Sequence, residues 1–184
     1  MADLAGAKIA YVGFSGTIDS AAATNIAKTL NVAVNDKYDG VYLLLSSVGG
    51  YVADAVYIYN HIRSLPISVT THNTGIVASA ANCIFVGGSP RFASRNSTFM
   101  IHPVTMGQPS SMAWQPLQAT LDAALANEKL IDGILRERTK IAEDVLSART
   151  LRDIYISAED AVKCGIIDDV HDFTLPPGHQ IFQI

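Results

Sequence analysis

The sequence predicts an α/β fold in which successive strands of a sheet are joined by crossover helices. Strand-like and helix-like patterns alternate along the first half of the chain, and the strand-like run at 41–45 is apolar or aromatic at every position. A continuous run of this kind is typical of a strand that is buried on both faces of a sheet. Alternation of strands with helices favours a sheet with helical crossover connections.

Local chemistry predicts where several of these elements begin and end. Asp19 and Ser20 are residue types that cap helices, and Pro66 disfavours helix in the residue before it. The predicted strands are 8–14, 40–45 and 67–71, and the predicted helices are 20–30, 51–62 and the short, buried 79–86, with a turn at 87–90.

The second half of the chain is dominated by one long pattern. Leucine and isoleucine recur at helical spacing over residues 110–140, which predicts a long amphipathic helix. Such a helix either protrudes and packs on a partner or lies on its own domain, and the spacing alone leaves both open. A second helix is expected at 141–148, and Ser157 is expected to cap another. We expect residues 1–184 to form a single domain with an irregular tail at about 173–184.

Composition excludes several classes of function. The chain has 184 residues, of which 49% are hydrophobic and only 16% charged, with a net charge of −4. Typical domains are about 25% charged, so a surface this poor in charge indicates contact with further copies of the chain. The absence of a basic run disfavours a nucleic-acid partner. No apolar stretch reaches the roughly 18 residues of a membrane span, and the N-terminus lacks a signal-peptide pattern, so we expect a cytoplasmic protein.

Cofactor and metal chemistry are not expected either. Cys83 and Cys164 lie in helical patterns and are expected to be buried thiols in a reducing compartment. No group of cysteine, histidine and acidic residues has metal-ligand spacing, and no phosphate-binding Gly-x-x-x-x-Gly-Lys-Ser/Thr loop occurs, so any use of ATP would require another protein. The histidines expected to be structural or surface residues are His61, His72, His171 and His179.

Ser79 is the first candidate catalytic residue. It ends the motif Gly-Ile-Val-Ala-Ser, which follows a β-branched run and precedes an alanine-rich stretch. This pattern favours a sharp strand-to-helix turn that carries a hydroxyl near the N-terminus of the helix, where free amides stabilise negative charge. His102 ends a further apolar run, and Asp153 follows later. The three residue types are those of a nucleophile, a general base and an orienting carboxylate, although a serine at this position is also a common helix cap.

A glycine pair marks a second strand-to-helix turn. Gly49 and Gly50 follow the predicted strand at 40–45 and precede the helix at 51–62. Glycines at such a turn let the backbone approach a ligand closely and direct amides toward it, although a simple tight turn has the same composition. Together, this turn and the one at Ser79 are expected to present two amides to one carbonyl oxygen.

Short motifs spread over residues 7–170 occur in the order and with the spacing of one peptidase family. They are Gly-Phe-Ser-Gly-Thr-Ile-Asp at 13–19, Ser-Val-Gly-Gly at 47–50, Gly-Ile-Val-Ala-Ser at 75–79, Met-Ile-His-Pro at 100–103, Asp-Ile-Tyr-Ile-Ser-Ala at 153–158 and Cys-Gly-Ile-Ile-Asp at 164–168. On these motifs the chain resembles the proteolytic subunits of Clp protease, which are serine peptidases of the crotonase-like fold. The resemblance implies repeated β-β-α units in a spiral core, with a protruding long handle helix at about 110–140.

The resemblance also implies roles for individual residues. Ser79 would be the nucleophile, His102 the general base and Asp153 the orienting acid, with the oxyanion hole formed by the amides of Gly50 and Ala80. At three positions the chain departs from the family's usual residues: Val48 replaces a proline, Ala80 a methionine and Pro103 a glutamine. Arg152 would take part in subunit contacts, although a solvated surface charge explains it as well.

The implied partners are further copies of the chain, in a ring or stacked rings, and peptide or unfolded protein substrates. An AAA+ unfoldase or a paralogous subunit is a further implied partner. The family's mature chain has a longer segment before its first strand, which helps to dock the unfoldase, whereas the first strand here is expected near Lys8. The sequence therefore favours peptide hydrolysis over ATP-dependent proteolysis.

Two other classes of function remain open at this point. A crotonase-like acyl-CoA enzyme would share the fold and the two oxyanion amides without needing the serine, histidine and aspartate. A weakly active or non-catalytic ring component would share the family's motifs without its hydrolysis.

Overall fold

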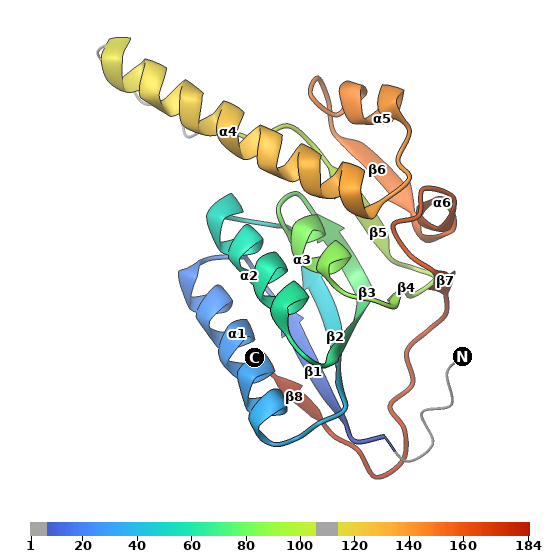
Figure 1. Ribbon diagram of the computed structural model, residues 1–184. Coiled ribbons are helices and arrows are strands. Elements are labelled where there is room, and N and C mark those ends of the chain that lie inside the picture. The colour runs from blue at the N-terminus through green and yellow to red at the C-terminus, as the bar shows by residue number, and fades with distance from the viewer. Residues whose placement is uncertain (1–6, 106–113) are drawn as a thin grey trace.

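A mostly parallel sheet forms the centre of the fold in the computed structural model, which describes residues 7–105 and 114–184 (Figure 1). The described strands run in the order β6-β5-β3-β2-β1-β8, and β4 pairs with β3 and β7. The strands are β1 (Ile9–Ser15), β2 (Gly40–Ser47), β3 (Ser68–Ala78), β4 (Arg91–Ala93), β5 (Thr98–Ile101), β6 (Ile154–Ser157), β7 (Asp169–Val170) and β8 (Ile181–Gln183). Of the described pairs, that of β5 with β6 is antiparallel and the others are parallel.

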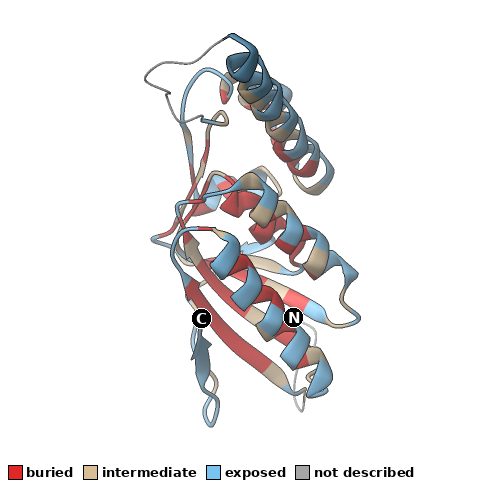
Figure 2. Cartoon of the chain, turned by 90° about the vertical axis from the view of Figure 1, so that its left-hand side faces the viewer, coloured by how far each residue is buried: buried red, intermediate tan, exposed pale blue. Residues whose placement is uncertain are grey.

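Helices connect the parallel strands and bury them. In Figure 1, α1 and α2 lie side by side, and α3 lies next to α2 on the side toward β5. The central strands are largely buried, whereas the outer faces of the helices that cover them are exposed (Figure 2). The helices are α1 (Ser20–Asn35), α2 (Val52–Ser64), α3 (Ala81–Gly87), α4 (Trp114–Arg138), α5 (Glu143–Ala148) and α6 (Ala158–Lys163).

Most predicted elements are present, and both predicted caps are confirmed. Asp19 accepts a hydrogen bond from the Ala22 amide at 2.8 Å, and Ser157 accepts one from the Asp160 amide at 3.1 Å. Each cap satisfies one of the amides that the first helical turn leaves without a partner.

The expected strand at 67–71 is longer than its pattern indicated. β3 continues to Ala78 through the polar residues His72 and Asn73, which are fully buried. Their side chains find partners inside the fold: His72 bonds to two hydroxyl groups, and the Asn73 amide group donates to the Thr98 carbonyl at 2.9 Å. Polar residues with buried partners break the hydrophobic pattern without breaking the strand.

Three further expectations are corrected. The tail is not irregular throughout, because Ile181–Gln183 form β8 and pair with β1 in parallel. α3 begins at Ala81, so Ser79 precedes this helix instead of opening it. Cys164 is half-buried at the end of α6, whereas Cys83 is fully buried, and both are free thiols. In the tail, pairing with a distant strand decides the structure, and short local patterns do not report such pairing.

The long predicted helix is present as α4, and it projects from the domain (Figure 1). Its C-terminal part buries Ile131, Ile134 and Leu135, while leucines in its N-terminal part are exposed. Residues 110–113 of the expected helix lie outside the described residues. In residues 7–105 and 114–184, no helix is both long and apolar enough to cross a membrane.

Candidate active site

Ser79 lies at the turn between β3 and α3 in an unusual backbone conformation. Its φ is 55°, in the left-handed region that residues other than glycine rarely occupy. The surrounding backbone holds it there: its amide donates to the Met100 carbonyl at 2.9 Å, and its carbonyl accepts from the Asn82 amide at 3.1 Å. The Asn82 side chain donates to the carbonyls of both Ser79 and Met100. A strained conformation that its neighbours impose is typical of functional sites.

Ser79 is not the cap of the helix that follows it. Ala80 occupies the N-cap position of α3, and no side chain caps this helix. The described residues provide no hydrogen-bond partner for the Ser79 hydroxyl group. The structure therefore removes the capping explanation that the sequence left open for this serine.

The pairing of three strands brings Ser79, His102 and Asp153 to one edge of the sheet. Ala78 of β3 pairs with Met100 of β5, and Ile101 of β5 pairs with Ile154 of β6. Ser79 and His102 follow their strands in the parallel pair, and Asp153 precedes its strand in the antiparallel pair, so all three leave the sheet in the same region. Ser79 and His102 are half-buried and Asp153 is exposed.

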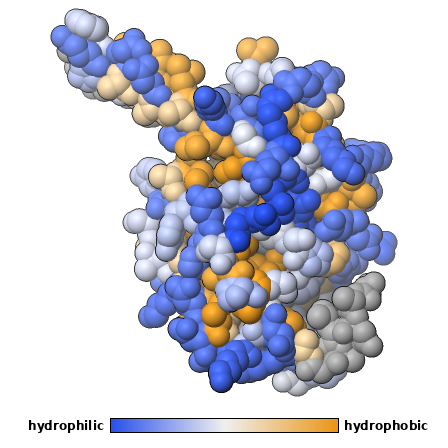
Figure 3. Space-filling model, in the orientation of Figure 1, coloured by the Kyte–Doolittle hydropathy of each residue, from blue (hydrophilic) through white to orange (hydrophobic). Residues whose placement is uncertain are grey.

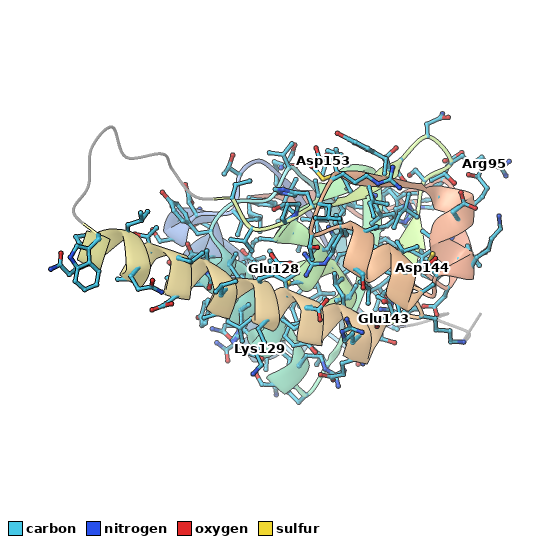
Figure 4. The ribbon with its side chains drawn as sticks, turned by 90° about the horizontal axis from the view of Figure 1, so that it is seen from above. Arg95, Glu128, Lys129, Glu143, Asp144 and Asp153 are labelled. Carbon is cyan, nitrogen blue, oxygen red and sulfur yellow. The ribbon has the colours of Figure 1, made fainter. Side chains whose placement is uncertain are left out.

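No hydrogen bond or ion pair joins these three side chains, all of which belong to the described part of the chain. Asp153 lies at the upper edge of the molecule in Figure 4, away from α4. The fold thus brings the three residues to a common edge without connecting them in a chain of hydrogen bonds.

The glycine turn lies directly against Ser79. A Cβ atom built on Gly49 would lie 2.6 Å from the Ser79 Cβ and 2.8 Å from the Ala78 carbonyl oxygen, so only glycine fits there. A bridge between Gly50 and Ile18 anchors the turn, in which Ile18 donates to the Gly49 carbonyl at 2.9 Å. The amides of Gly50 and Ala80 have no hydrogen-bond acceptor among the described residues.

Two residues that the sequence analysis did not single out hold the segment after His102. Arg149 donates to the His102 carbonyl at 3.2 Å, and Glu128 accepts from the Val104 amide at 2.8 Å. A signal for Arg149 was present in the sequence, because Arg149 follows Leu146 by three residues and therefore shares its buried face. The pattern gave no indication that an arginine on that face has acidic partners.

A separate histidine cluster lies farther along the sheet. The His72 ring is hydrogen-bonded to the Tyr42 hydroxyl at 2.8 Å and to the Ser94 hydroxyl at 3.1 Å, and His171 packs edge-on against it. Burial, and then the proximity of His171, lowers the pKa of His72 to about 4. Burial raises the pKa of Tyr42 to about 12, with a smaller contribution from Tyr11. His72 and Tyr42 therefore stay neutral near pH 7.

Cys83 is fully buried in the core of the described structure. This burial raises the pKa of the Cys83 thiol to about 12, so the thiol stays protonated. In the described ranges, no group of three histidine, cysteine or acidic side chains is placed to hold a metal ion.

The sequence model of the Clp protease family matches residues 7–173. The chain belongs to the Clp protease family. It is 26% identical over 178 residues to the "ATP-dependent Clp protease proteolytic subunit 2" of Pseudomonas aeruginosa, covering 92% of this chain and 86% of that one. It is also similar to the solved structure of a ClpP1 mutant from Listeria monocytogenes, with a TM-score of 0.76, 24% identity and coverage of 90% and 92%.

Family membership and the structural likeness confirm two expectations. The chain resembles the Clp proteolytic subunits over nearly all of its described length, and its fold is the ClpP-like, crotonase-like fold with a handle helix, here α4. The family is one of serine peptidases. The matched residues include the glycine turn and the sheet edge with Ser79, His102 and Asp153.

Proposed function

We propose that this Clp protease family member is a serine endopeptidase that hydrolyses short or unfolded polypeptides with Ser79, His102 and Asp153. The observation that carries the proposal is the left-handed Ser79 at the sheet edge to which strand pairing also brings His102 and Asp153. Membership of a serine peptidase family supports the reaction type, and the free amides of Gly50 and Ala80 support an oxyanion site beside Ser79.

The proposed mechanism follows from these positions. His102 takes the proton of the Ser79 hydroxyl as Oγ attacks the peptide carbonyl, and Asp153 holds the imidazole in the required tautomer. The amides of Gly50 and Ala80 donate to the oxyanion, and each such donor typically lowers the barrier by about 2.7–4 kcal/mol. His102 then protonates the leaving amine, and water hydrolyses the acyl-enzyme.

We further propose that copies of the chain assemble into a ring or stacked rings in the cytoplasm, and that assembly aligns the three catalytic side chains. α4 leaves Leu117, Leu121 and Leu125 exposed by 50%, 42% and 58%. Apolar residues gather on this arm where it leaves the body of the molecule (Figure 3). An exposed apolar stripe on a projecting helix is typical of a surface that packs on a partner.

Substitution of Ser79 tests the chemistry. Ser79→Ala is expected to abolish both hydrolysis of a fluorogenic peptide and labelling by a fluorophosphonate, and Asp153→Asn is expected to lower kcat about 10⁴-fold. Ser157→Ala is the matched control, because it removes a hydroxyl that caps α6, away from the site. Undiminished hydrolysis by pure Ser79→Ala protein would refute the proposal.

The same experiment distinguishes the two alternatives. In the described structure no hydrogen bond joins the side chains of Ser79, His102 and Asp153. This observation favours the non-catalytic ring component over the acyl-CoA enzyme. That component would assemble normally yet show neither hydrolysis nor labelling in the wild-type protein. An acyl-CoA enzyme would turn over a thioester while Ser79 stayed unlabelled.

Charges on the exposed stripe test the assembly. Replacing Leu121 and Leu125 by glutamate is expected to split the assembly and to lower activity, because two charges cannot be buried at an apolar contact. Multi-angle light scattering measures the mass, and Gln118→Glu, which adds a charge on the same helix at a polar position, is the control. A wild-type monomer at micromolar concentration would overturn the assembly proposal.

We also propose that, where folded substrates are degraded, an AAA+ unfoldase delivers them and a paralogous subunit in a mixed complex carries the surface that docks it; the relative from Pseudomonas aeruginosa is called ATP-dependent. Short peptides are expected to be cleaved without ATP. A tagged folded substrate is expected to survive the purified homo-oligomer. Its rapid degradation once a cognate unfoldase and ATP are added to that homo-oligomer would show that no paralogous subunit is needed.

A further inference from the structure

Arg149 is a charged side chain buried almost completely at the C-terminus of α5. It is only 1% exposed and is the largest of the fully buried side chains in the described structure. A buried guanidinium group is costly unless acidic partners and hydrogen-bond acceptors surround it. A buried arginine therefore needs close acidic partners, and removing it would leave the charges of those partners uncompensated.

The partners of Arg149 come from α4 and from the segment after β5. Its Nη1 lies 2.6 Å from Glu128 Oε1, and its Nη2 lies 3.5 Å from Asp132 Oδ1. Nη1 also donates to the His102 carbonyl oxygen at 3.2 Å. In Figure 4, Glu128 lies on the side of α4 toward Asp153, whereas Lys129 lies on the opposite side. Arg149 thus connects the acidic side of α4 to the backbone of the candidate base.

The segment after Ile101 has few other anchors. The described pairing of β5 with β6 ends at Ile101, so the sheet ladder no longer holds His102. Pro103 has no amide hydrogen to donate. The next amide, that of Val104, donates to Glu128 Oε2 at 2.8 Å. One ion pair, Arg149 with Glu128, therefore holds this segment at two successive points, the His102 carbonyl and the Val104 amide.

We propose that Arg149 is a positioning residue for His102, acting through the His102 carbonyl and through Glu128. This inference rests on the proposed function, in which His102 is the general base. The peptide planes on either side of the His102 Cα determine where its imidazole ring lies relative to Ser79. Small misplacements of a catalytic group cost large factors in rate, because the reacting atoms must meet in a narrow range of geometry.

Kinetics of Arg149 variants test the inference. Arg149→Met is expected to lower kcat for a fluorogenic peptide about 100-fold and to leave KM nearly unchanged, because the substrate contacts remain. Arg149→Lys keeps the charge but loses the planar fork that reaches two partners, so it is expected to restore only part of kcat. Hydrogen exchange of the peptide spanning residues 99–105 is expected to become faster in Arg149→Met, because the Val104 amide loses a fixed acceptor.

Two further variants separate positioning from general stability. Arg136→Met removes the other arginine of this ion network, which pairs with Asp132 and Glu143 but does not touch residues 102–104, and it is expected to keep kcat. If Arg149→Met does not fold, the double variant Glu128→Gln with Arg149→Met removes both charges of the pair, while Asp132 keeps Arg136 as its partner. The double variant is expected to fold and to show the same loss of kcat.

The outcomes are distinct from those that test the proposed function. Wild-type kcat in a folded Arg149→Met or double variant, with Ser79→Ala inactive, overturns the positioning role and leaves the peptidase intact. An equal loss of kcat in Arg136→Met also overturns it, because the effect would then belong to the whole network. Activity that persists in Ser79→Ala overturns the proposed function itself.

Discussion

His72 lies in β3 and His102 directly follows the neighbouring strand β5, yet the two histidines have opposite surroundings. His72 is fully buried, both of its ring nitrogens are hydrogen-bonded, and aromatic rings pack around it. The side chain of His102 is half-buried and has no hydrogen-bond partner among the described residues, although its backbone carbonyl is held by Arg149. The first histidine is enclosed as a neutral structural group, whereas the ring of the second is partly open to solvent.

The two histidines show that separation along the chain from Ser79 does not identify its catalytic partner. His72 lies in β3, only seven residues before Ser79, yet its ring packs in the aromatic cluster against Tyr42 and Phe173. His102 is farther along the chain, but β5 pairs with the end of β3 and places it beside the turn. Parallel pairing brings the ends of different strands together, whereas positions along one strand separate by about 3.3 Å per residue.

The largest effect is expected from replacing each of the two histidines separately. His102→Ala is expected to lower kcat about 10⁶-fold, as loss of the base does in a serine peptidase. His72→Gln, which retains groups able to bond the Tyr42 and Ser94 hydroxyls, is expected to stay within a few-fold of wild type. Steady-state hydrolysis of a fluorogenic peptide at pH 7 measures both, and a comparable loss in His72→Gln would remove the contrast between the two sites.

The next effect concerns the glycine turn against Ser79. Gly49→Ala is expected to lower kcat about 100-fold, because its φ of 98° and the 2.6 Å approach to the Ser79 Cβ leave no room for a methyl group. Gly133→Ala is the control: nothing lies within 4 Å of the added atom, and alanine favours helix. Unchanged labelling kinetics in Gly49→Ala would show that Ser79 tolerates displacement of the turn.

His72 is expected to make stability depend on pH. Its pKa falls from 6.5 to about 4 in the folded protein, chiefly through burial. Between these values the unfolded chain binds a proton that the folded protein refuses, so stability is present above pH 6.5 and is lost as the pH falls toward 4. The loss amounts to about 3 kcal/mol of unfolding free energy.

Urea denaturation between pH 7 and pH 4 measures this contribution. His72→Gln has no titrating ring and is expected to lose about 3 kcal/mol less than wild type over that interval. His61→Gln, which removes a half-exposed histidine bonded to Asn31, controls for the loss of any imidazole. Parallel pH profiles for wild type and His72→Gln would contradict the buried, neutral assignment.

The smallest effect comes from comparing two serines near helix starts. Ser157→Ala is expected to lower the free energy of unfolding by about 1 kcal/mol without changing kcat, because it removes the cap of α6. Ser79→Ala is expected to abolish hydrolysis and to leave the free energy of unfolding unchanged, because the Ser79 hydroxyl caps no helix. Denaturation and peptide hydrolysis of the two variants, measured side by side, check the assignment. A stability loss in Ser79→Ala as large as that in Ser157→Ala would indicate a structural hydroxyl.

Local chemistry in the sequence determined much of the fold. The apolar run at 41–45 predicted a buried strand, Asp19 and Ser157 predicted their helix caps, and the leucine spacing predicted α4. These features depend on neighbours a few residues away, so a pattern along the chain carries them. The ordered motifs also led to the Clp protease family, which the family match confirms.

Only the tertiary structure decided what depends on distant partners. It extended β3 through the polar residues His72 and Asn73, added β8 to the edge of the sheet, and placed Ser79 before α3 in a left-handed conformation. It also enclosed Arg149 among acidic groups of α4. A residue type and its spacing do not reveal whether a polar group finds its partner across the fold. Burial and hydrogen bonding between segments far apart in the chain decide that, and they distinguish the enclosed histidine from the free one.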